Sequence, residues 1–540
     1  MNSESRLKIP KWCRRTSIPL KTSLHLSEEK GSDVTSMQAT LVNRFRESVA
    51  KHPDSLAVAD STQRVSYQVL SDLVGKVSHY LMSSGLQKGD RVAMVVANSA
   101  EYAAIFYGIW SAGGVTVALN TQAKAKDIIN WVTHSDAKWL FMDLQHPEYK
   151  DVYEAGGEFT LIDVGSEDTG ESDNITMDWQ RIVYLEPANP KMLPGRSDLA
   201  SIIYTSGTTG NPKGVTLSHG NLCANIESIL AYLDLSAEDS ILNVLPFYYS
   251  YGNSILHTHL AIGGSMILEN SLLYPHRVME KMSEGAVSGF SGVPSTFALL
   301  LSRVNIGDYD LSKLRYITQA GGPLAPALAD RLSTALPHTE LFIMYGQTEA
   351  SARLTYLPPA MLEKKRGSIG IAIPNTTIEV RNKTGEVTAP GETGEICASG
   401  ENIMQGYWKD EERTDQVLKD GWLYTGDLAH TDADGYLYID GRSSDMIKSG
   451  ANRISPKEIE EVIQELEEVH EVAVIGSPDE MLGEIIKAYV VLKKGSELKQ
   501  RNIQRHCKNN LAIYKIPKSI AFIEELPKTA SGKIKKFLLK

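Results

Sequence analysis

The chain has 540 residues, a net charge of −11 and no apolar run long enough to cross a bilayer. A chain of this length is too long to fold around one hydrophobic core, so we expect a large domain and at least one smaller domain. The acidic balance disfavours sequence-independent binding of nucleic acid. Residues 501–540 are the local exception, with ten Lys and Arg against two Glu. This basic end suits phosphate groups, an acidic partner or plain solvation.

The cysteines are widely spaced and form no CxxC pair: Cys13, Cys223, Cys397 and Cys507. A reducing, cytoplasmic location is therefore the expectation, with neither a disulfide framework nor a metal site. His257 and His259 would share one face if their segment were a strand. No third ligand suggests itself near them, so structural roles are favoured over metal binding.

Residues 1–36 form an N-terminal extension that is basic at its start and has no continuous apolar core. They do not make a secretory signal, whereas weak organelle targeting is left open as a minority view. Met37 directly precedes the first clear helical pattern, which begins at Leu41. An alternative start at Met37 is also left open.

Helical and strand patterns alternate from here on. Residues 70–81 have helical spacing, 91–96 predict a buried strand, 101–110 a second helix and 115–119 a second strand. Such alternation predicts parallel α/β layers, and it continues to about residue 344.

After about residue 385 the sequence pattern changes to short predicted strands separated by Gly, Asp and Pro. This pattern predicts a β-rich part at about 385–440. Ser455, followed by Pro456 and then by Glu458 three residues on, predicts a helix start with a capping box. The fold class is therefore α/β, with a large domain at 37–442 and a small, mobile α+β domain at 443–540.

The most specific segment is YTSGTTGNPKG, Tyr204–Gly214. Glycines allow backbone N–H groups to converge on an anion, hydroxyls add donors, and Lys213 adds charge. A polyphosphate suits this loop. It is not a Walker loop, because Pro212 and Gly214 stand where that pattern needs Gly and Ser or Thr.

This string closely resembles the phosphate-binding loop of the acyl-adenylate-forming superfamily, which includes acyl-CoA synthetases, peptide-synthetase adenylation domains and beetle luciferases. Further motifs agree in order over nearly all of the chain from Met37: QAGGPL at Gln319–Leu324, YGQTEAS at Tyr345–Ser351, the segment Trp422–Glu460, and LPKTASGKIKK at Leu526–Lys536. The resemblance implies that 37–442 is the adenylating domain and that ATP and Mg²⁺ are required.

The resemblance assigns an ATP/AMP site to Thr205, Ser206, Gly207, Thr208, Thr209, Gly210, Lys213, Gly321, Gly322, Pro323, Tyr345, Gly346, Asp427 and Arg442. Within it Asp427, aided by Arg442, should hold the ribose hydroxyls. Thr348 should reach the α-phosphate, and Glu349 should bind Mg²⁺, since a carboxylate is a natural hard ligand. Lys533 should stabilise charge as the substrate carboxylate attacks phosphorus.

In such enzymes the small domain rotates after adenylation so that a thiol can reach the acyl-AMP. This implies a hinge at Ser444 and a thiol channel beside Lys448, Gly450 and Ala451. Two residues depart from the common pattern: Ser444 stands where Asp or Lys is usual, and Ala451 where many CoA ligases have Gly. The added methyl group narrows the channel slightly.

The acid pocket is assigned to Tyr248, Tyr249, Gly252, Asn253 and Gly292. No acidic residue lies in the segment 245–254, so an acid without an α-amino group is favoured, with aliphatic ahead of aryl. The predicted function is an acid–thiol ligase with CoA as acceptor. The alternatives are loading of the phosphopantetheine arm of an acyl carrier protein and, more distantly, a luciferase-like oxygenase. Acid identity, oligomeric state and pathway stay open.

Overall fold

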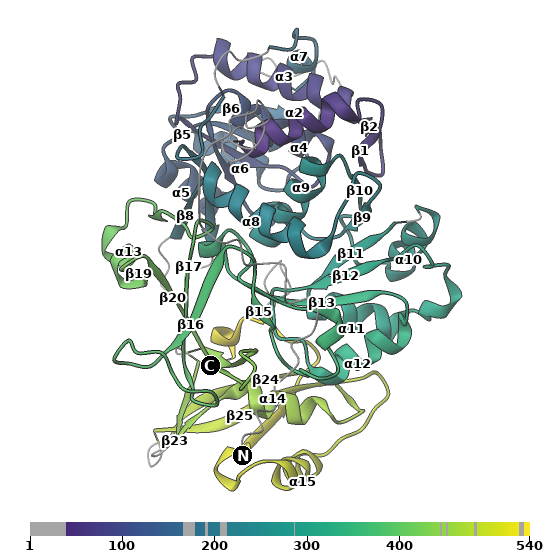
Figure 1. Ribbon diagram of the computed structural model, residues 1–540, viewed down its shortest axis with the longest axis vertical. Helices are drawn as coiled ribbons and strands as arrows, with labels where there is room; N and C mark the ends of the chain where they lie inside the picture. Colours follow the sequence, from purple (N-terminus) through teal and green to yellow (C-terminus); the bar gives the residue numbers. More distant parts are fainter. Residues whose placement is uncertain are drawn as a thin grey trace, which may run out of the picture. The chain divides into compact units, whose positions relative to one another are not determined.

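The computed structural model describes residues 39–540 apart from 166–178, 189–192, 206–212, 286, 443–444, 450–451, 480–482, 529–533 and 540. The fold described below is that of the compact unit Thr40–Lys540 (Figure 1). Among the described residues no helix is both long and apolar enough to cross a membrane.

A nine-stranded sheet lies at the centre of this unit, in the order β15-β14-β13-β12-β11-β9-β10-β1-β2. Its parallel strands are β1 (Leu56–Ala59), β9 (Ser240–Asn243), β10 (Ser265–Leu268), β11 (Gly289–Gly292), β12 (Tyr316–Gln319) and β13 (Glu340–Tyr345). Antiparallel strands close its two edges: β2 (Arg64–Ser66), β14 (Thr355–Leu357) and β15 (Ile371–Ala372).

Two groups of helices contact this sheet. The first group is α10 (Pro275–Glu284), α11 (Pro294–Arg303) and α12 (Pro326–Ala335). Apolar side chains of these helices enclose a small void together with Phe290 and Ile317 of the sheet. The second group is α8 (His219–Leu233) and α9 (Ser250–Ile262). Tyr232 of α8 stacks on Tyr356 of the sheet. His259 of α9 makes a hydrogen bond with the hydroxyl of Tyr316.

A seven-stranded sheet has the order β18-β8-β7-β4-β3-β5-β6. Its strands are β3 (Arg91–Val95), β4 (Val115–Ala118), β5 (Ala137–Asp143), β6 (Thr160–Val164), β7 (Leu199–Thr205), β8 (Lys213–Ser218) and β18 (Gly406–Tyr407). The helices of this region are α2 (Leu41–Lys51), α3 (Tyr67–Ser83), α4 (Ala100–Ser111), α5 (Ala125–Ser135), α6 (Tyr149–Ala155) and α7 (Trp179–Val183). Helix α4 is apolar and buried on almost every side, as expected of a core helix. The predicted parallel α/β layers are confirmed.

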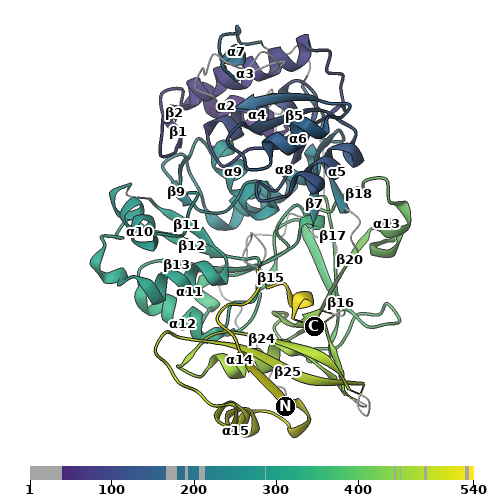
Figure 2. The same cartoon turned by 180° about the vertical axis from the view of Figure 1, so that it is seen from behind.

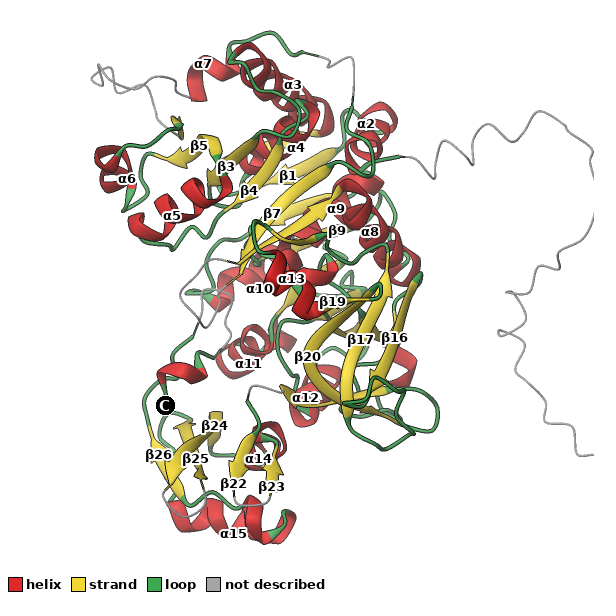
Figure 3. Ribbon diagram, turned by 90° about the vertical axis from the view of Figure 1, so that its left-hand side faces the viewer, coloured by secondary structure: helices red, strands yellow, loops and turns green. Residues whose placement is uncertain are grey.

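A smaller sheet consists of antiparallel strands (Figure 3). They are β16 (Thr376–Arg381), β17 (Gly394–Gly400), β19 (Leu418–Lys419), β20 (Trp422–Thr431) and β21 (Leu437–Arg442), with α13 (Glu411–Val417) before β19. Strand β16 precedes residue 385, where the sequence analysis placed the start of the β-rich part.

The C-terminal region has its own five-stranded sheet and its own apolar core (Figure 2). The strands are β22 (Ile447–Ser449), β23 (Asn452–Ile454), β24 (Val469–Asp479), β25 (Gly483–Leu492) and β26 (Ser519–Phe522), with α14 (Pro456–Gln464) and α15 (Gln500–Asn510). Short 3₁₀ helices complete the chain: η2 (Ile306–Asp308), η3 (Thr348–Ala350), η4 (Pro359–Met361), η5 (Ile513–Lys515) and η6 (Lys536–Leu538).

The capping box predicted at the start of α14 is wrong. Ser455 does precede the helix, but its hydroxyl makes no cap bond there. It donates to the backbone oxygen of Asp440 in β21, and Glu458 pairs with Lys515 instead of the helix start. Both side chains that the local pattern assigned to the cap therefore bond to residues outside the helix instead.

Candidate active site

The residues predicted from the sequence to bind adenine and ribose lie together at the carboxyl-terminal ends of strands in the nine-stranded sheet. Strands β11, β12 and β13 run parallel and end at Gly292, Gln319 and Tyr345. Ligands of open α/β sheets bind at the carboxyl ends of such strands. This edge is therefore the natural place for a nucleotide.

A buried carboxylate lies beside the end of β13. Asp427 is 7% exposed; its Oδ2 accepts a hydrogen bond of 2.7 Å from the Tyr345 hydroxyl, and its Oδ1 accepts one of 2.7 Å from Nε of Arg442. Asp427 and Arg442 face each other in the register of β20 and β21. The carboxylate raises the pKa of Arg442, and burial raises the pKa of Tyr345 far above its usual range. The three side chains thus form a fixed, charge-assisted group.

The turn after β12 contains Gly321 with φ of 83°, a left-handed conformation that favours glycine. The Gln319 side chain is fully buried and donates from Nε2 to the backbone oxygen of Gly322 at 2.8 Å. Its Oε1 has no partner among the described residues. A turn held in this way can frame a planar base, and Pro323 follows in the same turn.

Glu349 lies in η3, just after β13. Its Oε1 accepts a hydrogen bond of 2.8 Å from the hydroxyl of Tyr407, a residue in β18. The ammonium group of Lys213 lies 5.8 Å from the centre of the same Tyr407 ring. Burial, and next the carboxylate, raise the pKa of Tyr407 above its usual range. Tyr407 therefore links the lysine of the phosphate loop to the carboxylate assigned to Mg²⁺.

Gly346 has a steric reason to be glycine. A Cβ there would lie 2.0 Å from the backbone oxygen of Ala352, which is far inside contact distance. The chain folds back tightly after Tyr345, and this turn brings the Thr348 hydroxyl within 3.3 Å of the Ser250 hydroxyl at the start of α9.

The residues assigned to the acid pocket surround the start of α9 and the end of β11. Tyr248 is buried and packs on Tyr249 at 4.5 Å between ring centres. Asn253 is buried in α9. Packing requires glycine at position 252, since a Cβ there would lie 2.2 Å from the oxygen of Pro246. A Cβ on Gly292 would lie 3.1 Å from the Phe297 ring, which is a tight contact.

Several assigned residues lie outside the described part of the chain: Ser206, Gly207, Thr208, Thr209, Gly210, Ser444, Gly450, Ala451 and Lys533. The ends of the phosphate loop are described, and Thr205 of β7 pairs with Lys213 of β8. Lys448 is described only by its backbone in β22.

Several residues that hold the site together carry no signal in the sequence. Asn98 donates from Nδ2 to the oxygen of Leu245 and accepts from the amide of Phe247, both at 2.8 Å, so it fixes the segment before α9. Tyr407 was missed because its partner Glu349 is 58 positions away. No linear pattern marks such pairs.

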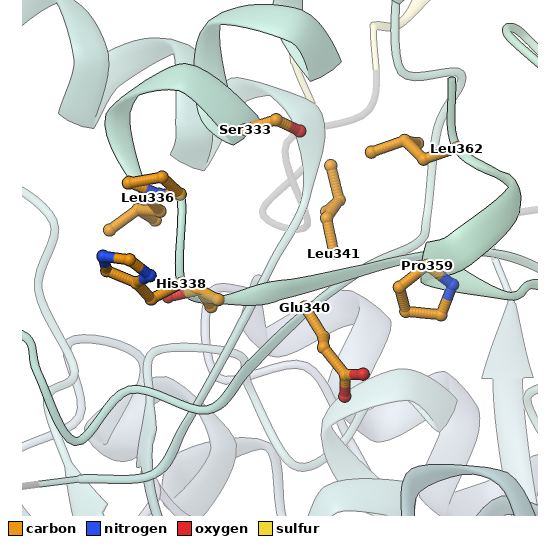
Figure 4. A pocket seen from close by; sticks show the side chains of 9 residues that line it. Ser333, Leu336, His338, Glu340, Leu341, Pro359 and Leu362 are labelled. Carbon is orange, nitrogen blue, oxygen red and sulfur yellow. The ribbon is translucent and has the colours of Figure 1, made fainter.

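A cavity of about 280 Å³ lies elsewhere, around Ser333, His338 and Glu340 (Figure 4). Glu340 begins β13, whereas the candidate site lies where that strand ends. The cavity is therefore separate from the candidate site.

Comparisons with known proteins identify the family of this chain. The AMP-binding enzyme family matches residues 45–408, and the AMP-binding enzyme C-terminal domain matches 458–533. A feruloyl-CoA synthase of Amycolatopsis sp is 33% identical over 485 residues, 90% of this chain and 95% of its own. A long-chain-fatty-acid–CoA ligase of Bacillus subtilis is 31% identical over 525 residues, 92% of this chain and 93% of its own.

Among solved structures, an anthranilate CoA ligase in complex with anthranoyl-AMP has a TM-score of 0.84 and 26% identity, covering 93% of this chain and 97% of that one. The chain therefore belongs to the family of AMP-binding enzymes and is an AMP-forming acid–thiol ligase.

Proposed function

We propose that this enzyme activates a carboxylic acid without an α-amino group as acyl-AMP, and then transfers the acyl group to the sulfur of CoA. The observation that carries the proposal is the fixed group of Asp427, Tyr345 and Arg442 at the strand ends, with Glu349 and Thr348 following directly on the chain. A buried carboxylate can accept from both ribose hydroxyls.

In the first step a substrate carboxylate oxygen attacks the α-phosphorus of ATP, and pyrophosphate leaves. Thr348 donates to the α-phosphate, and Lys213 adds positive charge near the phosphates. Lys533 is assigned to the charge that develops between the two reacting groups. The turn at 321–323 receives the adenine.

The residues present fit a role for Mg²⁺ in this step. Tyr407 engages Oε1 of Glu349, and no described residue bonds Oε2. No group of three or more His, Cys, Asp or Glu that could hold a metal occurs in the described part of the chain. Mg²⁺ commonly binds through one or two carboxylates and the substrate phosphates, so a single Glu349 suffices. The ion supplies charge neutralisation for the leaving pyrophosphate.

In the second step the CoA thiol attacks the acyl carbonyl, and AMP leaves. The names of the relatives, which are CoA ligases, support CoA rather than a carrier protein as acceptor. The proposed hinge at Ser444 and the channel at Ala451 belong to this step. Relatives named for feruloyl and for long-chain substrates leave both aryl and aliphatic acids to be tested.

The test is a pyrophosphate-release screen of the purified full-length enzyme with ATP, Mg²⁺ and acids that vary in length, aromaticity and charge. Each acid is offered with CoA and, separately, with a carrier protein bearing its phosphopantetheine arm. We expect acid-dependent pyrophosphate and AMP together with acyl-CoA. Pyrophosphate without any thioester, or thioester only on the carrier protein, would contradict the proposal.

A further inference from the structure

Arg353 is a buried cation without an acidic partner. The residue is 3% exposed, and no carboxylate among the described residues pairs with it. Nη1 donates to the Tyr232 hydroxyl at 2.9 Å and to the Met344 sulfur at 2.7 Å, and Nη2 lies 3.4 Å from the Ser254 hydroxyl. Nε has no partner. Because a guanidinium stays protonated, burial without a counter-ion costs stability.

The donors around Arg353 point at a poor acceptor. The Tyr232 hydroxyl donates to the Met344 sulfur at 3.2 Å, which is the same sulfur that Nη1 approaches. A thioether is only a weak acceptor. A carboxylate in reach of these donors would accept far stronger, charge-assisted bonds.

The two residues before Arg353 have strained backbone conformations. Ser351 and Ala352, just before it, have φ of 59° and 126°, a region that favours glycine. Two amides hold this strained turn: Asn225 donates to the oxygen of Arg353 at 2.9 Å, and Asn402 does so at 3.3 Å. The position of Arg353 is thus fixed together with Thr348 and Glu349, which immediately precede the turn.

Arg353 and Thr348 contact helix α9 about one helical turn apart. Helix α9 contacts Thr348 through Ser250 and Arg353 through Ser254. Residues four apart on a helix are about 6 Å apart along its axis. Between the two serines, Tyr251 presents its ring to the guanidinium, with 5.2 Å from Cζ to the ring centre.

Hydroxyl groups lie around Tyr251, whose ring contacts the guanidinium. The hydroxyl of Tyr251 bonds Thr318 of β12 at 2.8 Å, and Thr318 bonds Ser291 of β11 at 2.6 Å. Thr318 and Ser291 are each 1% exposed. A site for a long alkyl chain would be lined mainly by apolar side chains. These hydroxyls and the guanidinium instead suit a short acid with a charged far end.

We propose that Arg353 binds a second carboxylate at the far end of the acid, so that the preferred substrates are dicarboxylic acids of roughly four to six carbons, given about 1.5 Å for each C–C bond. The inference rests on the proposed function, since it names the acid class for the same site. The guanidinium pairs with the distal carboxylate while the other carboxylate reacts near Thr348.

The test compares acids that differ in the distal charge. The full-length enzyme is assayed for CoA-dependent AMP formation with succinate, glutarate and adipate, with monomethyl glutarate, and with hexanoate. We expect kcat/KM for the best diacid to exceed that for monomethyl glutarate at least 10-fold. In Arg353→Met the KM for the diacid should rise at least 10-fold and the diacid preference should disappear, whereas the KM for ATP stays unchanged. Arg353→Lys should keep part of the preference.

Arg315→Met is the matched control. Arg315 also stacks on a tyrosine of β12, at 5.0 Å from Tyr316, but it pairs with Asp239. Its loss should leave the order of acids unchanged. If Arg353→Met does not fold, the comparison of acids on the unaltered enzyme decides the question alone.

Equal use of glutarate and monomethyl glutarate, or a preference for hexanoate, with acyl-CoA as product, would overturn this inference and leave the proposed function intact. An unchanged order of acids in Arg353→Met would overturn it as well. Failure of every acid, including aryl and long-chain acids, to yield pyrophosphate and acyl-CoA would instead overturn the proposed function.

Discussion

Asp427 and Arg442 face each other across strands β20 and β21, with the carboxylate Oδ1 accepting from the guanidinium Nε at 2.7 Å. The other oxygen of this carboxylate accepts from Tyr345 at the end of β13. The pair therefore joins the smaller sheet to the edge of the nine-stranded sheet where the nucleotide is proposed to bind.

Asp427→Asn should weaken ATP binding, because the amide removes the negative charge and one acceptor from the ribose. Hydrogen bonds to charged groups contribute about 1.5–3 kcal/mol, so the KM for ATP should rise by about 10- to 100-fold. Acid-dependent pyrophosphate exchange measures this KM. Asp440→Asn, a change at a carboxylate of the neighbouring strand β21, should leave it within about twofold of the normal value. A normal KM in Asp427→Asn would remove Asp427 from the site.

Tyr407→Phe should raise the Mg²⁺ concentration needed for half-maximal adenylation. The change deletes the hydroxyl that holds Oε1 of Glu349 but keeps the ring beside Lys213. A net hydrogen bond of about 1 kcal/mol corresponds to roughly fivefold. The measurement is a Mg²⁺ titration of pyrophosphate release, with Tyr438→Phe as the control. An unchanged titration would show that Tyr407 does not position Glu349.

Lys533→Ala should slow acyl-AMP formation by about 10²- to 10³-fold, because it removes a charge placed for the transition state, worth about 3–4 kcal/mol. Conversion of supplied acyl-AMP to acyl-CoA should persist, since the lysine is assigned to the first step only. Single-turnover assays of the two half-reactions give both rates, and Lys535→Ala serves as the neighbouring control. Equal losses in both half-reactions would contradict the assignment.

Ala451→Leu should leave first-turnover pyrophosphate release near normal and greatly slow thioester formation, because a larger side chain would obstruct the pantetheine arm. Ala451→Gly should be tolerated or should improve the use of free CoA. The measurement is a single-turnover comparison of acyl-AMP and acyl-CoA for the three proteins. Unchanged thioester rates in Ala451→Leu would mean that the thiol approaches by another route.

Stability should fall as the pH drops below about 6.5, because burial lowers the pKa of His257 to about 3 and that of His259 to about 4. In the unfolded chain histidine binds a proton near pH 6.5, so acid favours unfolding until the folded pKa is reached. Each histidine contributes a slope of about 1.4 kcal/mol per pH unit between about pH 6 and pH 4.

His257→Gln should reduce this slope by about 1.4 kcal/mol per pH unit, whereas His276→Gln at an exposed position should not change it. Urea unfolding at pH 7, 6 and 5 measures the slopes. Equal slopes in His257→Gln and the unaltered enzyme would show that His257 is not buried in its neutral form.

The sequence by itself determined the chemistry and the fold class. Glycines, hydroxyls and one lysine in Tyr204–Gly214 indicate a phosphate loop because their properties are local, and alternating helix and strand patterns depend only on neighbouring residues. The same locality explains one failure: the Ser455 hydroxyl bonds to the backbone oxygen of Asp440 instead of forming the predicted cap. The sequence favoured structural roles for His257 and His259, and both are buried in helix α9.

Only the tertiary structure decided which side chains meet. Asp427 and Tyr345 are 82 positions apart, and Glu349 and Tyr407 are 58 apart. Their contacts depend on how separate sheets pack against one another, which no short sequence pattern encodes. Arg353 looked like an ordinary charged residue in the sequence. Its importance follows from burial without a counter-ion, and burial depends on the packing of α8, α9 and β13 around it.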